Sequence, residues 1–389
     1  MSFGVYIHFP YCSKRCSYCD FAIAVRRRIP HQRYADAVLR ELSARAPLYD
    51  GRTLFTVYLG GGTPGLWDPA CVERVLAGVR GAFGGAAPVE VTLEANPGDL
   101  APGALSRLRT AGVDRLSLGV QTFARRQLDV LGRAHGPEEA ARAVAEARAA
   151  GFDNLSLDLI FALPGQTLGD LDLDLARLID LGAEHLSLYG LTVEERTPFG
   201  ALSRAGLLPR GGDEVEAEMF ERVERRLRAA GYDHYEISNY ARPGRRAVHN
   251  GLYWTGGEWL GLGSSAHSFR RLPDGGGERF ATWKQVDRYF AAVSRIAPHL
   301  GPDDPLVASH ERLTADDLAR EAIWLGFRLL DRGVDRAAFA ARFGADPVAR
   351  FPAEFARLAA EGLVRLEADR ALLSPRGVLV ADAVAARFL

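Results

Sequence analysis

The sequence predicts an α/β fold, built as a partial (β/α)6 TIM-like barrel followed by a small C-terminal α+β domain with a winged-helix-like pattern. Short β-rich runs alternate with helical runs about six times in the first half, which is typical of parallel strands joined by helices. Eight repeats would complete a closed barrel, so six predict an open one. After about residue 199 the alternation fades, and helices followed by a short hairpin predict the C-terminal domain.

The six predicted strands are short β-rich runs, most of them bounded by Gly, Pro or Asn. Helices are expected between them. Pro137 opens one helix and Gly151 closes it, because proline favours the first helical position and glycine the position after the end. In such barrels the chemistry gathers where the strands end, so the residues that follow each strand are the first candidates for a site. The strands are expected at residues 4–7, 55–59, 89–93, 115–118, 154–159 and 185–188.

The second half of the chain carries different signals. Asp213 and Glu216 are spaced as a capping box, which predicts that a helix begins there. Thr314 is expected to cap a later helix that stops near Gly333. The Gly- and Pro-rich residues 272–278 predict a connection between two strands. These changes divide the chain into three expected segments: a barrel core at 1–210, an accessory helix with strands at 211–305, and a winged-helix-like domain at 306–389.

Composition limits the classes of function. The chain has 389 residues, 48% of them hydrophobic and 25% charged, as in soluble globular proteins. A formal net charge of −1 predicts neither nucleic acid nor an anionic membrane as a partner. No apolar run reaches the roughly 20 residues of a membrane span, and no secretory signal is evident, so we expect a cytoplasmic protein. Four cysteines do not form a disulfide framework, and three of them crowd together, which favours metal binding.

Those three cysteines form a CxxxCxxC run at Cys12, Cys16 and Cys19, directly after the first predicted strand. Iron–sulfur clusters are normally held by four thiolates, so three leave one iron open to a cofactor or substrate. A structural zinc site is the alternative, with His8 or Cys71 as the fourth ligand. Cys71 lies in an apolar helical run and has the pattern of a small buried hydrophobe.

This cysteine motif resembles the radical S-adenosylmethionine (SAM) superfamily. The resemblance implies a [4Fe–4S] cluster on the three cysteines, with the open iron bound by the amine and carboxylate of S-adenosylmethionine. In that superfamily the cluster reduces the cofactor and releases a 5′-deoxyadenosyl radical. Residues 60–64 (GGGTP) resemble the glycine motif that meets the cofactor's amino group. Tyr6 and Tyr18 are placed to pack on the cofactor, although Tyr6 also fits an ordinary strand core.

A longer series of motifs is similar to the oxygen-independent coproporphyrinogen III oxidase family and covers nearly the whole chain. By that resemblance, Gly61 and Glu94 should contact the cluster-bound S-adenosylmethionine. Five further residues match positions that line a second cofactor site: Gly62, Thr63, Gln121, Arg133 and Asp158. A structural polar network under the barrel mouth is the alternative for the polar members of this set. The motifs are 6–12 (YIHFPYC), 60–64, 93–97 (LEANP), 117–122 (SLGVQT), 131–135 (LGRAH), 158–167 (DLIFALPGQT) and 191–194 (LTVE).

Two departures separate the chain from the oxidase itself. Phe21 stands where the oxidase has a further cysteine, and Cys12 lies almost at the start, without the oxidase's N-terminal extension. Both features are similar to the haem chaperone branch of the family, which is marked by a His-Asn-x-x-Tyr-Trp motif. Residues 249–254 read HNGLYW. The resemblance implies haem as a ligand and makes His249, Tyr253 and Trp254 candidates for binding it. A hydrogen-bonded histidine in a turn is the alternative for His249, and His267 is a second possible iron ligand.

The motif is chemically suited to a porphyrin, because a neutral imidazole can ligate haem iron and aromatic rings offer flat faces. We therefore expect a cytoplasmic haem chaperone with a [4Fe–4S] cluster and S-adenosylmethionine, which delivers haem to respiratory acceptor proteins. One alternative is oxidative decarboxylation of coproporphyrinogen III to protoporphyrinogen IX. Another is radical chemistry on a different substrate. The winged-helix-like tail lacks a basic stripe, so nucleic acid is not expected as a partner.

Overall fold

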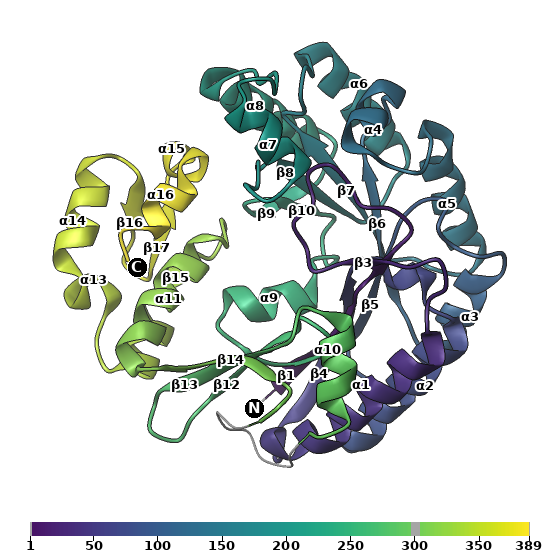
Figure 1. Ribbon diagram of the computed structural model, residues 1–389. Coiled ribbons are helices and arrows are strands. Elements are labelled where there is room, and N and C mark those ends of the chain that lie inside the picture. Colours follow the sequence, from purple (N-terminus) through teal and green to yellow (C-terminus); the bar gives the residue numbers. More distant parts are fainter. Residues whose placement is uncertain (1, 297–303, 389) are drawn as a thin grey trace.

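The computed structural model describes residues 2–296 and 304–388, and within them the central feature is a twelve-stranded sheet (Figure 1). The six predicted strands lie side by side in chain order and run parallel. The predicted partial barrel is therefore confirmed. These strands are β1 (Ser2–Phe9), β4 (Thr53–Gly61), β5 (Glu90–Ala95), β6 (Arg115–Gln121), β7 (Leu155–Phe161) and β8 (His185–Gly190).

A seventh parallel strand, β11 (Glu258–Leu262), pairs with β1 on the opposite side from β4. It was not predicted, because it lies where the regular strand–helix alternation has faded. Short antiparallel strands continue the sheet at both edges, and the predicted connection at residues 272–278 joins two of them. They are β10 (Asn239–Ala241) and β9 (Asp233–Glu236) beside β8, and β12 (His267–Arg271), β13 (Gly277–Thr282) and β14 (Val307–Leu313) beyond β11.

The two faces of the barrel sheet have different chemistry. Successive strand residues point to opposite faces, so Val57 and Leu59 of β4 pack in the hydrophobic core, whereas the Tyr58 hydroxyl contacts Glu94 on the inner side. Helices cover the outer face (Figure 1), which leaves the polar inner face for a site. These helices are α1 (His31–Arg45), α2 (Pro69–Ala82), α3 (Ala104–Ala111), α4 (Arg125–Leu131), α5 (Pro137–Ala149), α6 (Leu168–Asp180) and α8 (Asp213–Ala229).

Two predicted helix ends need correction. Asp213 is not a capping residue: it is the first residue of α8, the N-cap is Gly212, and Glu216 pairs with Arg210 instead. Thr314 does cap α11 (Ala315–Phe327), but that helix ends well before Gly333. It stops early because the following chain forms an isolated β-bridge to β9 through Leu329.

The C-terminal domain has a three-stranded sheet and its own aromatic core, which includes Phe327, Phe355 and Phe388. The ion pair between Arg328 and Glu236 connects it to the barrel edge. Its remaining elements are β15 (Val334–Asp335), α12 (Arg336–Phe343), α13 (Pro347–Arg350), α14 (Pro352–Ala360), β16 (Val364–Leu366), β17 (Arg370–Leu373), α15 (Pro375–Leu379) and α16 (Ala381–Ala385).

Three further helices matter for the site. The helix α9 (Val248–Trp254) lies on the inner side of the sheet, between the barrel strands and α11 (Figure 1). The helix α7 (Pro198–Arg204) adjoins the cysteine loop, and α10 (Val286–Val293) packs beside α1. No helix in the described part of the chain is both long and apolar enough to cross a membrane. The segment boundaries near 210 and 305 stay predictions, and residues 297–303, beside the second one, lie outside the described residues.

Candidate functional site at the barrel mouth

A cavity of about 390 Å³ opens at the carboxyl ends of the parallel strands. Its walls come from the cysteine loop and from the ends of β4, β5, β6, β7 and β8. Nearly every cofactor residue inferred from the sequence lies on it, because the ends of parallel strands meet at one edge of the sheet. Those lining residues are Cys12, Cys16, Cys19, Tyr18, Gly61, Gly62, Thr63, Glu94, Gln121, Arg133 and Asp158.

The cysteine loop is fastened to the barrel by backbone hydrogen bonds. Ser17 N donates to Leu131 O at 2.9 Å, Phe199 N donates to Ser17 O at 3.1 Å, and Ala24 N donates to Pro10 O at 2.7 Å. The loop also pairs through the short strands β2 (Tyr11–Cys12) and β3 (Ala24–Val25). The three thiols are therefore presented to the cavity by a loop with a defined path.

The thiols have a donor environment that fits an iron–sulfur cluster. All three are free. Thr63 Oγ1 donates to Cys12 Sγ at 3.5 Å, and Arg133 Nη1 lies 3.6 Å from Cys16 Sγ. Burial raises the pKa of Cys12 to about 11, so its thiolate needs a bound cation for stabilisation.

Neither candidate for a fourth zinc ligand faces the thiols. Cys71 is fully buried in α2, in the hydrophobic core with Val72 and Val75. The His8 ring nitrogens are both engaged, Nδ1 with the Tyr6 hydroxyl at 3.0 Å and Nε2 with Ala22 O at 3.1 Å. In the described residues, no three His, Cys, Asp or Glu side chains gather as ligands of one metal ion.

Glu94 is held in place at the floor of the cavity. Its carboxylate accepts hydrogen bonds from the Tyr58 hydroxyl at 2.7 Å and from Gly61 N at 3.1 Å. Burial raises its pKa to about 7, although the bond from Tyr58 opposes the shift. Gly61 has φ 110°, and a Cβ there would lie 2.6 Å from the His8 ring. Only glycine can therefore bring this backbone N–H to the carboxylate.

Asn96 is a site residue that the sequence reasoning did not assign. Its Oδ1 accepts from Arg133 Nη2 at 2.5 Å, and its Nδ2 donates to Thr63 Oγ1 at 3.1 Å. Arg133 also donates to Gly119 O at 2.6 Å, and its Nε is buried without a partner among the described residues. The available signal was the LEANP segment, which places Asn96 two residues after Glu94.

Gln121 and Asp158 line the opposite wall. Gln121 has φ 68°, in the left-handed region, where the β6–β7 register shifts. Such a bulge re-aims a side chain, and the Gln121 amide here lies over Gly119. Asp158 accepts from Ser117 Oγ at 3.1 and 3.2 Å, and its pKa is raised by burial. Both polar groups therefore face the cavity with their positions defined.

Tyr6 is the one proposed cofactor residue that does not line the cavity. Its ring lies 6.1 Å from the ring of Tyr58 on the inner face of the sheet, and its hydroxyl bonds His8. The structure thus gives Tyr6 the strand-core position that was the alternative in the sequence. Tyr18, in contrast, lies in the cavity wall.

His249, the first residue of the HNGLYW motif, is enclosed near the amino ends of the strands. It is fully buried, with Nδ1 2.8 Å from Thr56 Oγ1 and Nε2 2.9 Å from the Tyr253 hydroxyl. The Glu90 carboxylate accepts from His249 N at 2.9 Å and from Val248 N at 2.9 Å, which anchors the start of α9. Burial lowers the pKa of His249 to about 3, so the imidazole is neutral at physiological pH.

The remaining haem candidates point elsewhere. Trp254 lies under the Arg328 guanidinium, 4.4 Å from it, at the contact with the C-terminal domain. His267 is exposed at the start of β12 and pairs across the sheet with Ala281.

Tyr58 lies between the cavity and the HNGLYW motif. Its ring lies 5.1 Å from the His249 ring and its hydroxyl bonds Glu94. The Tyr58 side chain therefore contacts both Glu94 at the cavity floor and His249 of the motif.

Two family models match the chain. Residues 6–198 match the radical SAM superfamily, and residues 313–380 match the HemN C-terminal domain. The fold is similar to a solved structure of coproporphyrinogen III oxidase (HemN) from Escherichia coli, with a TM-score of 0.83 and 24% identity over all of this chain and 90% of that one.

Curated relatives specify the branch. A heme chaperone HemW of Mycobacterium tuberculosis is 38% identical over 98% of this chain and 93% of its own length. The heme chaperone HemW of Bacillus subtilis is 34% identical over 99% of both chains. That of Escherichia coli is 41% identical over 70% of this chain and 71% of its own. The predicted branch is thus confirmed, and the chain belongs to the HemW haem chaperone family of radical SAM proteins.

Proposed function

We propose that this chain binds haem through His249 in the cytoplasm and passes it to a respiratory acceptor protein. The observation that supports this most directly is the HNGLYW motif, which holds a neutral imidazole beside aromatic side chains in a member of this family. Neutral imidazole is the form that ligates iron. The chemistry of the motif therefore agrees with haem as the cargo.

Haem ligation would require Nε2 of His249 to be uncovered, because the residue is fully buried. Both ring nitrogens of His249 are hydrogen-bonded, and Nε2 is covered by Tyr253, four residues later in the same short helix. Rotation of the Tyr253 side chain would free Nε2, while Thr56 continues to hold Nδ1 and so keeps the ring oriented. A hydrogen bond to the second nitrogen is the usual way in which a ligating histidine is positioned.

The barrel mouth would hold the cluster and its cofactor. Cys12, Cys16 and Cys19 would ligate three irons, and Glu94 with Gly61 would receive the amino group of S-adenosylmethionine. When bound, this pair supplies one-electron reduction of a sulfonium. The Glu94 carboxylate would hold the cofactor amine, and Arg133 and Asn96 would offer polar contacts. Tyr58 contacts both Glu94 at the cluster site and His249, which offers a physical basis for the cluster site to influence haem binding.

Anaerobic haem titration of cluster-reconstituted protein tests the proposal. We expect one haem per wild-type chain, much weaker binding by His249→Ala, and unchanged binding by His310→Ala, whose histidine is exposed on β14. Loss of haem from the complex on addition of a haem-free cytochrome would support delivery. Turnover of coproporphyrinogen III by the same sample, without haem binding, would contradict the proposal and favour the oxidase.

A further inference from the structure

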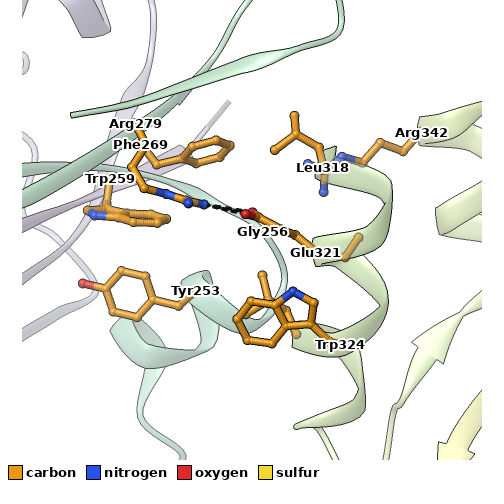
Figure 2. Close-up of a pocket in the computed structure, with 11 residues that line it drawn as sticks. Tyr253, Gly256, Trp259, Phe269, Arg279, Leu318, Glu321, Trp324 and Arg342 are labelled. Atoms are coloured by element: carbon orange, nitrogen blue, oxygen red, sulfur yellow. Dashed lines mark hydrogen bonds and ion pairs between the residues drawn. The ribbon is translucent and has the colours of Figure 1, made fainter. Parts of the chain in front are cut away.

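A second cavity, of about 210 Å³, lies between the barrel edge and the C-terminal domain (Figure 2). Four aromatic side chains line it: Tyr253, Trp259, Phe269 and Trp324. The Tyr253 and Trp259 rings meet edge to face with centroids 4.8 Å apart, and those of Trp259 and Phe269 are 5.4 Å apart. Flat apolar walls of this kind suit a planar aromatic ligand.

The cavity also carries more positive than negative charge, because Arg279 and Arg342 line it with one carboxylate, that of Glu321. Arg342 extends into it from α12 (Figure 2). Its guanidinium packs against the backbone of Gly256, where a Cβ would lie 2.9 Å from Nη1. The Glu321 carboxylate is bound by Arg279 through two contacts of 2.9 Å. Among the described residues, none forms an ion pair with Arg342. Burial and the nearby Arg271 lower the pKa of Arg342 to about 10, although the negative charge of Glu321 opposes the shift, so Arg342 remains a cation at neutral pH.

Trp324, which lines the same cavity, carries a second polar group without a partner in the described part of the chain. The Trp324 indole Nε1 is buried and has no hydrogen-bond partner among the described residues. Its nitrogen-bearing edge is turned towards the other residues of the group in Figure 2. Buried donors are rarely left unpaired, and an indole N–H can only donate. Trp324 and Arg342 together therefore call for acceptor oxygens that carry negative charge, as in a carboxylate.

We propose that this cavity binds the carboxylate-bearing edge of a planar aromatic ligand, with Arg342 and the Trp324 N–H as its anion-binding groups. Identification of that ligand as haem rests on the proposed function, because haem carries its propionates on one edge of a flat ring. The cavity is smaller than the roughly 300–1,000 Å³ of whole-ligand pockets, so it accommodates one edge. Tyr253 lines this cavity and also bonds His249, which connects carboxylate docking with release of the imidazole.

The test uses three probes on the full-length, cluster-reconstituted chain: haem, metal-free protoporphyrin IX, and haem with both propionates esterified. We expect Arg342→Gln to bind haem and protoporphyrin IX about tenfold more weakly than wild type, because one charge-assisted contact is lost. Trp324→Phe, which keeps an aromatic ring but removes the N–H, should weaken the same two probes. The diester should bind wild type and Arg342→Gln equally.

The matched control is Arg332→Gln, which removes an exposed arginine from the same domain and should bind as wild type. Circular dichroism checks that each variant is folded. If wild type binds haem but Arg342→Gln and Trp324→Phe bind every probe equally well, this inference is wrong and the proposed function stands. If wild type binds neither haem nor protoporphyrin IX, both are overturned.

Discussion

The Tyr253 hydroxyl lies 2.9 Å from Nε2 of His249 and closes the nitrogen that an iron would need. Thr56 holds the other ring nitrogen at 2.8 Å. The histidine of the motif is therefore neutral, and the Tyr253 hydroxyl covers its Nε2. Tyr253 is the side chain that bonds Nε2, and Thr56, Glu90 and Tyr58 enclose the rest of the residue.

The first prediction concerns the Tyr253 hydroxyl that covers Nε2 of His249. Tyr253→Phe removes the hydrogen bond to His249 and should accelerate haem uptake in stopped-flow absorbance measurements. The loss of one buried bond should lower the free energy of unfolding by about 0.5–1.5 kcal/mol. Tyr232→Phe is the control, because its buried hydroxyl donates to Ala183 O and not to a group of the motif, so its loss should affect only stability. Slower or weaker haem uptake by Tyr253→Phe would show that Tyr253 assists binding.

The second prediction concerns the cysteines. Cys16→Ser should reduce the iron bound after anaerobic reconstitution from about four per chain towards zero, with loss of the cluster's visible absorbance. Cys71→Ala also removes one thiol, but Cys71 lies in the α2 core and not at the cavity, so the iron content should be unchanged. Equal iron in Cys16→Ser and wild type would remove Cys16 from the ligand set.

The third prediction follows from the pKa of Glu94, which burial raises to about 7 from an ordinary 4.5. Between these values the folded chain binds more protons than the unfolded chain, so this group's contribution to stability falls as the pH rises. In the cluster-free chain, Glu94→Gln should unfold with a higher free energy than wild type at pH 8, by on the order of 2 kcal/mol. The two should be nearly equal at pH 5.

Urea unfolding at both pH values measures this difference. Glu146→Gln, a change to an exposed carboxylate of α5, should show no such pH-dependent gain. An identical pH slope in wild type and Glu94→Gln would mean that Glu94 is ionised throughout this range.

The fourth prediction concerns how the C-terminal domain is attached. Arg328 Nε lies 2.7 Å from the Glu236 carboxylate, whose side chain is fully buried. Arg328→Ala leaves that charge without its ion pair and should reduce the free energy of unfolding by about 3–5 kcal/mol. Arg332→Ala, at an exposed position nearby, should change it little. Thermal or urea unfolding measures the effect. A small effect of Arg328→Ala would mean that the backbone contacts of Leu329 and Leu330, and not the ion pair, attach the domain.

Most residues of the candidate site could be named from the sequence because the motifs that mark them are local. The CxxxCxxC spacing places three thiols on one loop, and GGGTP and LEANP each follow a strand. Parallel strands bring their ends together, so residues at these ends meet in one cavity whatever the length of the intervening helices. The position of Tyr6 on a strand was also predictable from the sequence. Whether it lies close enough to the strand end to line the cavity was not.

Pairings across long separations could not be predicted from the sequence. Nothing in the local pattern places β11 beside β1, and the Thr56 hydroxyl and the imidazole that it bonds are 193 residues apart in the chain. The cover of Tyr253 over His249, and the approach of Arg342 to Gly256, depend on how α9 packs between two parts of the protein. Spacing and residue type are local properties of the chain, so the candidate site residues could be named without a structure. Which of them are open to a ligand depends on burial and hydrogen-bond partners, and these arise from contacts between distant segments.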